Sequence, residues 1–378
     1  MARCVWGCVA MALLLGWGSG SAVAQEASGE FRRWDANSDG QLARDELPEF
    51  FRPLFERIDA DSNGTISPEE DRRFRGRVIS AGGTASAEGR PPMNPMPRLP
   101  DSVRVEFDIP YAGTDNPKQK LDLYFSKNAK SDKPLPVVAF IHGGAWQQGD
   151  RRGGFRMIEP MVASGDYVGC SIGYRLSGEA IWPAQIEDCK AAVRWLRAHA
   201  KEHGIDPERI GVMGSSAGGH LVGMLGTTGG VTELEGSLGA DTSTSSRVQA
   251  VVDLFGPADF GAFMLEAPQG PVARLLGATP QSKPELAKAA SPISYVSKDD
   301  PPFLIIHGSK DPVVPYSQSV AFEEALEKAG VDTMLVKVVD GGHGNFNTPA
   351  VPERIKAFFD KHLLGRDVKV GTEAIIAK

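Results

Sequence analysis

The sequence predicts an α/β fold preceded by a small, acidic helical module. Two observations carry this prediction. From Ser102 onward, short apolar runs alternate with helical patterns, and two similar acidic segments of twelve residues come before them. The length of 378 residues, a hydrophobic fraction of 41% and a charged fraction of 24% fit a globular protein with a sizeable core. The net charge of −7 argues against a nucleic-acid-binding protein.

The first 24 residues have the pattern of a secretory signal peptide: Arg3 is followed by the apolar run Val9–Leu15 and by small residues at Ala22–Ala24. The alternative is a membrane anchor, but the apolar run is shorter than the ~20 residues that cross a bilayer. We expect a secreted or periplasmic protein with no membrane span after cleavage. The mature chain would keep two cysteines, Cys170 and Cys189, which could pair but whose positions favour free core thiols.

Residues 25–75 contain two tandem loops, Asp35–Glu46 and Asp59–Glu70. Each carries oxygen-bearing side chains at positions 1, 3 and 5, glycine at 6 and glutamate at 12, which is the oxygen-rich pattern that calcium prefers. The loops resemble the EF-hand family, and Leu42 and Ile66 should pair them through a short β-contact. We expect structural Ca²⁺, outside catalysis, on Asp35, Asn37, Asp39, Gln41 and Glu46, and on Asp59, Asp61, Asn63, Thr65 and Glu70.

The spacing of these loops departs from a standard EF-hand pair. Only Leu47–Ile58 lies between them, which is room for one shared helix. This compact spacing resembles dockerin modules, although those usually end their loops with aspartate. Two roles stay open: the module binds a protein partner or senses calcium, or calcium only stabilises it. Residues 76–100, with five prolines, read as a flexible linker.

Residues 101–365 alternate between strands and helices, and residues 366–378 read as a C-terminal tail. The pattern predicts a mostly parallel, eight-stranded sheet with helices on both faces, in which the first two strands are antiparallel. The expected strands are Val103–Ile109, Leu121–Phe125, Val137–His142, Tyr167–Tyr174, Arg209–Gly214, Ala250–Leu254, Phe303–His307 and Thr333–Val339. The expected helices are Pro183–His203, Ala217–Thr227, Ser317–Ala329 and Val351–Leu364.

A G-x-S-x-G segment, Gly214–Gly218, lies between a predicted strand and a predicted helix. Small residues around a serine allow the sharp turn that lifts its hydroxyl above the sheet, so the pattern indicates Ser216 as a nucleophile. Small residues also occur at ordinary strand-to-helix turns. The strand–turn–helix context favours the catalytic interpretation.

A serine nucleophile needs a histidine base and an acid that orients it. Among seven histidines, His343 is the best candidate, because it lies in a glycine-rich loop just after the last strand. Asp311, after the seventh strand, is the expected acid, and Asp259, one strand earlier, is its rival. We expect the other histidines in structural positions: His220 in packing, His142 and His307 at strand ends beside the site, and His199, His203 and His362 on the surface.

The segment His142–Trp146 follows the third strand, where backbone amides that bind an oxyanion belong. We expect the amides of Gly144, Ala145 and Ala217 to form the oxyanion hole. The pattern alone also fits a plain tight turn. The segment after the third strand, Ser216, Asp311 and His343 follow one another along the chain in the order that the catalytic interpretation requires, so we favour it.

With these residues in place, the region 101–365 resembles the α/β-hydrolase fold, and within it the HGG-type carboxylesterases related to hormone-sensitive lipase. It is most similar to a bacterial feruloyl/acetyl-esterase-like branch, on the segments Gln119–Tyr124, His142–Asp150, Tyr174–Leu176, Pro183–Asp188 and Ser216–His220. The resemblance implies a small ester or an acylated polysaccharide as substrate. Ala145 replaces the third glycine of the commoner loop.

The sequence therefore predicts a secreted serine esterase that works through an acyl-enzyme. Peptidase or formamidase chemistry on the same scaffold is the alternative, as is a calcium-dependent tethering protein. Trp146, Phe155 and Trp182 are candidates for the pocket wall, although buried packing explains such aromatic residues equally well.

Overall fold

The computed structural model describes residues 31, 34–47, 55–71, 73, 99–130, 133–262, 269–344, 346 and 348–376. The signal-peptide prediction and most of the predicted linker lie outside these residues. The chain divides into two compact units, Met1–Pro92 and Met93–Lys378. Within the described chain, no helix is long and apolar enough to cross a bilayer.

In the first unit, the two acidic loops pair through their eighth residues. The amides of Leu42 and Ile66 each donate to the other's carbonyl at 2.9 Å, which confirms the predicted β-contact. Helix α2 (Phe55–Ile58) is the last turn of the predicted inter-loop helix, whose earlier residues 48–54 lie outside the description. The loops and the helix share a small apolar core of Phe31, Leu42, Leu47, Phe55, Ile58 and Ile66.

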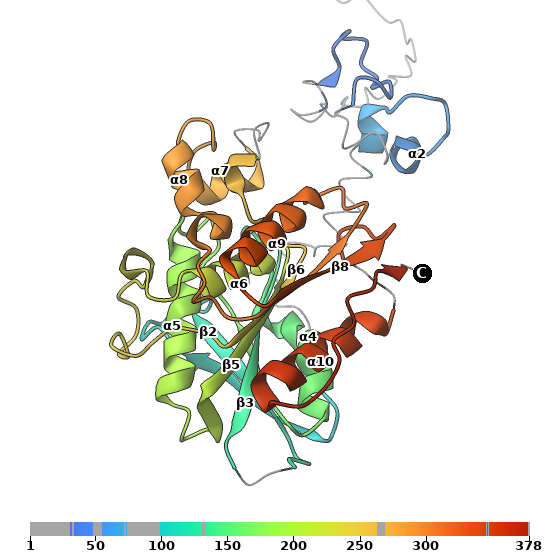
Figure 1. Cartoon of the computed structure of the whole chain (residues 1–378). Helices are drawn as coiled ribbons and strands as arrows, with labels where there is room; N and C mark the ends of the chain where they lie inside the picture. Colours follow the sequence, from blue (N-terminus) through green and yellow to red (C-terminus); the bar gives the residue numbers. More distant parts are fainter. Residues whose placement is uncertain are drawn as a thin grey trace, which may run out of the picture. The chain divides into compact units, whose positions relative to one another are not determined.

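The second unit is built on one sheet (Figure 1). Its described strands follow the order β1-β2-β4-β3-β5-β6-β7-β8-β9. The β1–β2 and β2–β4 pairs are antiparallel and all the others are parallel. The strands are β1 (Val103–Pro110), β2 (Lys120–Ser126), β3 (Leu135–Ile141), β4 (Val168–Ile172), β5 (Ile205–Ser215), β6 (Ala250–Leu254), β7 (Phe303–Gly308), β8 (Thr333–Val339) and β9 (Ile375–Ile376).

The prediction of eight strands is wrong by one, because the described part of the sheet has nine. The additional strand, β9, lies in the segment predicted as a tail and pairs in parallel with β8 through Val338 and Ile375. Two residues are too few to show an alternating pattern, so the sequence carries no signal for this strand. Ile375 and Ile376 therefore belong to the sheet.

Helices cover both faces of the sheet. One face is packed by α4 (Phe155–Ala163) and α10 (Ala350–Leu364), which lie next to each other (Figure 1). The other face is packed by α5 (Ala184–Ala198), α6 (Ala217–Thr227) and α9 (Ser317–Ala329). The short helices α7 (Pro271–Leu276) and α8 (Pro284–Ala289) contribute apolar side chains to the same core cluster. Cys170 in β4 and Cys189 in α5 are buried free thiols.

Three of these helices lie where the sequence analysis expects no helix. The helices α4, α7 and α8 were not predicted, and α4 holds Pro160, a residue that usually interrupts a helix. The predicted helix from Pro183 to His203 ends already at Ala198, and the chain turns at Gly204, whose φ is +64°. The limits of α6 and α9 agree with the prediction.

His220, on α6, lies inside an aromatic cluster rather than in a reactive position. Its ring centroid is 4.7 Å from that of Phe260, 5.3 Å from that of Trp146 and 5.5 Å from that of Trp182. Its Nε2 donates a hydrogen bond of 2.7 Å to the Ala290 carbonyl. Burial lowers the pKa of His220 to about 4. The predicted packing role of this histidine is confirmed.

The buried His220 should make stability depend on pH. Its pKa is about 4 in the folded protein and about 6.5 in the unfolded chain, so its contribution is complete above pH 6.5 and is lost as the pH falls toward 4. His220→Gln keeps a donor for the Ala290 carbonyl but does not titrate. On going from pH 7 to pH 4, the His220→Gln variant should therefore lose about 3 kcal/mol less of its free energy of unfolding than the parent protein loses.

Urea unfolding at both pH values measures this difference. The control is Phe260→Leu, which alters the same cluster without removing a titrating group and should change stability about equally at both. A parent protein and a His220→Gln variant with parallel pH profiles would contradict the expectation.

Candidate active site

Ser216 lies in a sharp turn between β5 and α6, with φ 56° and ψ −119°. The turn has no space for side chains on either side. A Cβ on Gly214 would lie 2.3 Å from the Gly218 carbonyl oxygen, and one on Gly218 would lie 2.1 Å from that of Ile141. The glycines of the G-x-S-x-G segment are therefore required by close backbone contact, and the strained serine is lifted above the sheet edge.

His343 and Asp311 lie beside this serine. The Nε2 atom of His343 is 2.9 Å from Ser216 Oγ, and its Nδ1 atom is 2.7 Å from Asp311 Oδ2. A carboxylate only accepts hydrogen bonds, so Nδ1 carries the proton and Nε2 is free to accept from the serine hydroxyl. The three residues follow β5, β7 and β8, and they meet where the carboxyl ends of parallel strands reach one edge.

Asp311 is buried and ionised. Burial alone would raise its pKa, but hydrogen bonds from His307 and His343 and from the Val313 amide hold that pKa well below its usual range. Its Oδ1 atom accepts from the amides of Val313 at 2.8 Å and Val314 at 3.0 Å. The rival acid, Asp259, instead accepts from the Gly261 amide at 2.8 Å. The structure thus brings Asp311, not Asp259, to the histidine.

The loop after β3 approaches the serine from the other side. Gly144 has φ +117°, and a Cβ there would lie 2.2 Å from the Gln148 carbonyl oxygen. Ala145 has a left-handed φ of 54°, which is unusual for a residue with a side chain. Gly144 and Ala145 line the same pocket as Ser216. Ala217 is the first residue of α6, where an amide has no intrahelical acceptor.

The pocket at this site has a volume of about 740 Å³ and mostly apolar walls. Besides the catalytic residues and the loop after β3, its wall comes from α4, α10 and the loop that precedes α10. Among the described lining residues, Arg156 is the one arginine, lysine or carboxylate side chain, and it is exposed at the first turn of α4. The main apolar lining residues are Met157, Pro160, Leu254, Phe255, Val313, Phe346, Val351, Pro352 and Ile355.

Trp146, Phe155 and Trp182 do not line this pocket. All three are buried elsewhere, Trp146 and Trp182 around His220 and Phe155 against Tyr124. The sequence interpretation missed the real wall because it predicted no helix at residues 155–163. The helical spacing of Phe155, Ile158 and Val162 was an available signal for that helix.

None of the remaining histidines contacts Ser216 in the described part of the chain, and one of them, His307, contacts the catalytic acid. His142 stacks on Tyr174 at 4.4 Å between ring centroids, and burial lowers its pKa to about 4. His203 and His362 are partly buried and lie near Glu106 and Asp332, and His199 lies near Asp241. His307 is fully buried and contacts Asp311, as expected for a residue beside the site.

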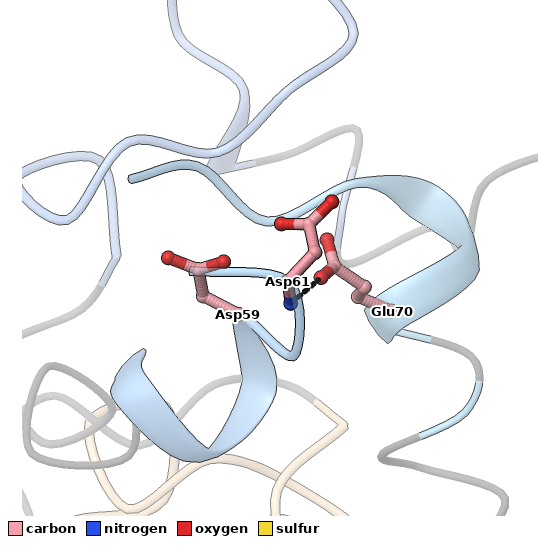
Figure 2. A group of neighbouring side chains, drawn as sticks. All are labelled: Asp59, Asp61 and Glu70. Atoms are coloured by element: carbon pink, nitrogen blue, oxygen red, sulfur yellow. Dashed lines mark hydrogen bonds between the residues drawn. The ribbon is translucent and has the colours of Figure 1, made fainter. Parts of the chain in front are cut away.

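The two acidic loops of the first unit have the internal bonding of metal-binding turns. In both, the aspartate at position 1 accepts from the glycine amide at position 6, at 2.9 Å in each loop. In the second loop, Asp59, Asp61 and Glu70 each place a carboxylate oxygen within 4.8 Å of the others (Figure 2). Glu70 also accepts from the amides of Ala60 and Asp61, at 2.8 and 3.3 Å.

The donor set fits a hard cation such as Ca²⁺, because it consists of carboxylate and amide oxygens wrapped by a glycine turn. Burial alone would raise the pKa of Glu70, but hydrogen bonds from Ser67 and from the loop amides lower it, so this carboxylate is ionised. The side chains of Gln41 and Thr65 join the two loops through a contact of 2.9 Å. The residues predicted as ligands thus occupy two equivalent turns.

Comparison with known proteins extends this description. The BD-FAE family profile matches residues 121–326, which include Ser216 and Asp311. Esterase LipQ of Mycobacterium tuberculosis is 34% identical over 263 residues, covering 68% of this chain and 61% of its own length. Esterase LipC of the same organism is 36% identical over 242 residues, covering 61% and 58%. The chain thus spans about three fifths of the length of these curated relatives.

Solved structures agree with the sequence matches. A truncated carbohydrate esterase from gut microbiota has a TM-score of 0.66 and 36% identity, covering 70% of this chain and 98% of its own. A bifunctional GH43-CE protein of Bacteroides eggerthii has a TM-score of 0.64 and 34% identity, covering 70% and 36%. With a profile match over more than half its length, on a sheet and serine turn of the α/β-hydrolase type, the chain belongs to the BD-FAE family.

Proposed function

We propose that this protein is a serine carboxylic-ester hydrolase that works through an acyl-enzyme. The observation that carries the proposal is the hydrogen-bonded series Ser216–His343–Asp311 at the wall of an open pocket. This arrangement supplies a nucleophile, a base and an acid that orients the base. The esterase names of the related proteins support the same reaction class.

In the first half of the reaction, Ser216 Oγ attacks the ester carbonyl carbon while its proton passes to His343 Nε2. The carbonyl oxygen becomes an oxyanion, which the amides of Gly144, Ala145 and Ala217 would bind. His343 then gives the proton to the departing alcohol oxygen as the C–O bond breaks. The acyl group remains on Ser216. Asp311 stays ionised throughout and stabilises the imidazolium.

In the second half, a water molecule attacks the acyl carbon. His343 takes the proton of this water and returns it to Ser216 Oγ as the acyl bond breaks. The products are a carboxylic acid and the free enzyme. Water can reach His343 through the pocket, because the side chain of this histidine is partly exposed. The side chain of Asp311 is fully buried behind it.

For the substrate, we infer an acetylated or feruloylated polysaccharide. Two observations support it: carbohydrate esterases are among the structural relatives, and the pocket is wide enough for more than an acetyl group. Peptidase and formamidase activities are the alternatives on this scaffold. Turnover of acetylated xylan and methyl ferulate, beside a peptide amide and an N-formyl compound, separates the three classes.

We further propose that the first unit binds two Ca²⁺ ions and that the protein acts outside the cytoplasm after signal cleavage. Its paired loops and shared core support a folded calcium module. A role in attaching the enzyme to a partner is the second candidate function, favoured by the close spacing of the loops. Deleting residues 26–75 and measuring turnover and particle association separates attachment from stabilisation.

Removing the nucleophile should abolish turnover. In Ser216→Ala, kcat for p-nitrophenyl acetate is expected to fall by roughly 10⁴-fold or more, because the acyl-enzyme cannot form. A fluorophosphonate probe should add one label to the parent protein and none to the variant, as mass spectrometry of the intact chain would show. Circular dichroism checks that the variant is folded. Turnover at the parental rate would contradict the proposal.

Arg156 should favour substrates that carry a negative charge near the ester. Arg156→Met is expected to lower kcat/KM about fivefold for a monoester of a dicarboxylic acid, since a charge pair in a solvated pocket is worth about 1 kcal/mol. The neutral ester of the same length should be unaffected. Lys328→Met, on the exposed face of α9, is the matched charge control. Equal losses for both esters would argue against a charge-specific role.

Loss of one calcium ligand should empty one loop. By calorimetric titration of the full chain, the parent protein is expected to bind two Ca²⁺, and Glu70→Gln one at the same concentrations, because position 12 normally contributes both carboxylate oxygens. The control is Glu69→Gln, since this neighbour is exposed and pairs with Arg73. A Glu70→Gln protein that still binds two ions with parental affinity would count against the assignment.

A further inference from the structure

His307 lies behind the catalytic acid and has no role in the steps above. It is the penultimate residue of β7, and its side chain is fully buried. Both ring nitrogens are engaged. Nε2 lies 3.1 Å from Asp311 Oδ2 and 2.9 Å from the Val314 carbonyl oxygen, and Nδ1 lies 2.6 Å from Ser319 Oγ on α9.

These contacts fix the protons of the ring. The Asp311 carboxylate and the Val314 carbonyl can only accept hydrogen bonds, so the Nε2 of His307 carries a proton and donates it to both. In the neutral ring, Nδ1 then accepts from the Ser319 hydroxyl. The result is a continuous series of hydrogen bonds from Ser319 through His307, Asp311 and His343 to Ser216.

Asp311 is thereby held by four donors. Its Oδ1 atom accepts from the Val313 and Val314 amides, and its Oδ2 atom accepts from the two imidazoles, of His307 and of His343. The carboxylate has no freedom to rotate without losing one of these bonds. Because both imidazoles bind the same oxygen, the bond from His307 also withdraws negative charge from the oxygen that faces His343.

We propose that His307 is a positioning residue of the catalytic site: it fixes the Asp311 carboxylate and reduces the proton affinity of His343 through the shared oxygen Oδ2. The inference rests on the proposed ester hydrolase function. Its consequence has a definite sign. Without the donor from His307, Oδ2 would carry more charge and stabilise the His343 imidazolium, so the acid-side pKa of the kcat/KM profile would rise.

Other groups that face His307 must be considered with it. Asp253, on β6, is buried and interacts electrostatically with His307, and burial raises the pKa of Asp253 to about 6. The Tyr316 ring lies 5.6 Å from the imidazole and that of Phe255 lies 6.4 Å from it, both edge-on. Ser319 completes the surroundings from α9. Of these neighbours, Asp253 is the one whose titration could overlap with the acid side of the profile.

Two amide substitutions separate the contacts of the ring. The amide nitrogen of glutamine can occupy the place of Nε2, so His307→Gln keeps the donor to Asp311. The shorter His307→Asn places its amide where Nδ1 lies, so it keeps the contact with Ser319 and loses the one with Asp311. The two variants bury similar polar groups, and a purely structural role for His307 would affect them alike.

The experiment measures kcat and KM of the parent and both variants across the acid side of the pH profile. His307→Asn is expected to lose about tenfold in kcat at little change in KM, and to raise the acid-side pKa by about half a unit, as for a lost charge-assisted hydrogen bond. His307→Gln should stay close to the parent in both. The acid-side pKa should rise by the same amount when His307→Asn is introduced into the Asp253→Asn variant. This result would exclude the titration of Asp253 as the source of the rise.

Equal behaviour of the two variants, or an unchanged acid-side pKa in folded His307→Asn, would overturn the inference. If His307→Asn does not fold, the downfield proton resonance of the His343–Asp311 hydrogen bond is compared between the parent and His307→Gln, where it should be preserved; its loss would also overturn the inference. Failure of the proposed function is distinct, because it would appear as turnover by Ser216→Ala whatever His307 does.

Discussion

The register of β3 against β5 is the constraint on which the site depends. Ile141 pairs with Gly214, so the loop after β3 and the turn after β5 leave the sheet at the same level. Their backbones meet without side chains between them: a Cβ on Gly143 would lie 2.7 Å from the Ser215 carbonyl oxygen, and one on Gly218 would be closer still to Ile141. This contact brings the oxyanion loop and the nucleophile to one pocket.

The parallel order of the later strands completes the site in the same way. β7 and β8 are neighbours, so the loops that follow them bring Asp311 and His343 together. β6 lies between β5 and β7 and supplies no member of the triad, but Phe255, just after it, packs edge-on against His343 at 4.7 Å between ring centroids. The histidine is thus held between an acid on one side and an aromatic ring on another, and its Nε2 reaches Ser216.

The positions of Ser216, His343 and Asp311 could be predicted from the sequence because each follows a strongly apolar strand and carries distinctive local chemistry. The wall of the pocket is harder to predict, since it depends on how α4 and α10 pack. The apolar spacing in α4 is helical, but this helix also holds Pro160, a residue that argues against a helix. The two-residue strand β9 gave no periodic signal. That two histidines share one carboxylate oxygen depends on the loop after β7 folding back, which no pattern along the chain reveals.

The two units also explain how the charge of the chain should be interpreted. Residues 25–75 hold 13 acidic and 8 basic side chains, a net charge of −5, out of −7 for the whole chain. These acidic groups are concentrated in the paired loops, whose carboxylates accept hydrogen bonds from their own backbone amides and would repel one another without a cation. The pocket of the second unit, by contrast, has no acidic side chain among its described lining residues and carries Arg156. Most of the net negative charge therefore lies in the first unit, whereas the charged side chain that lines the pocket of the second unit, Arg156, is positive.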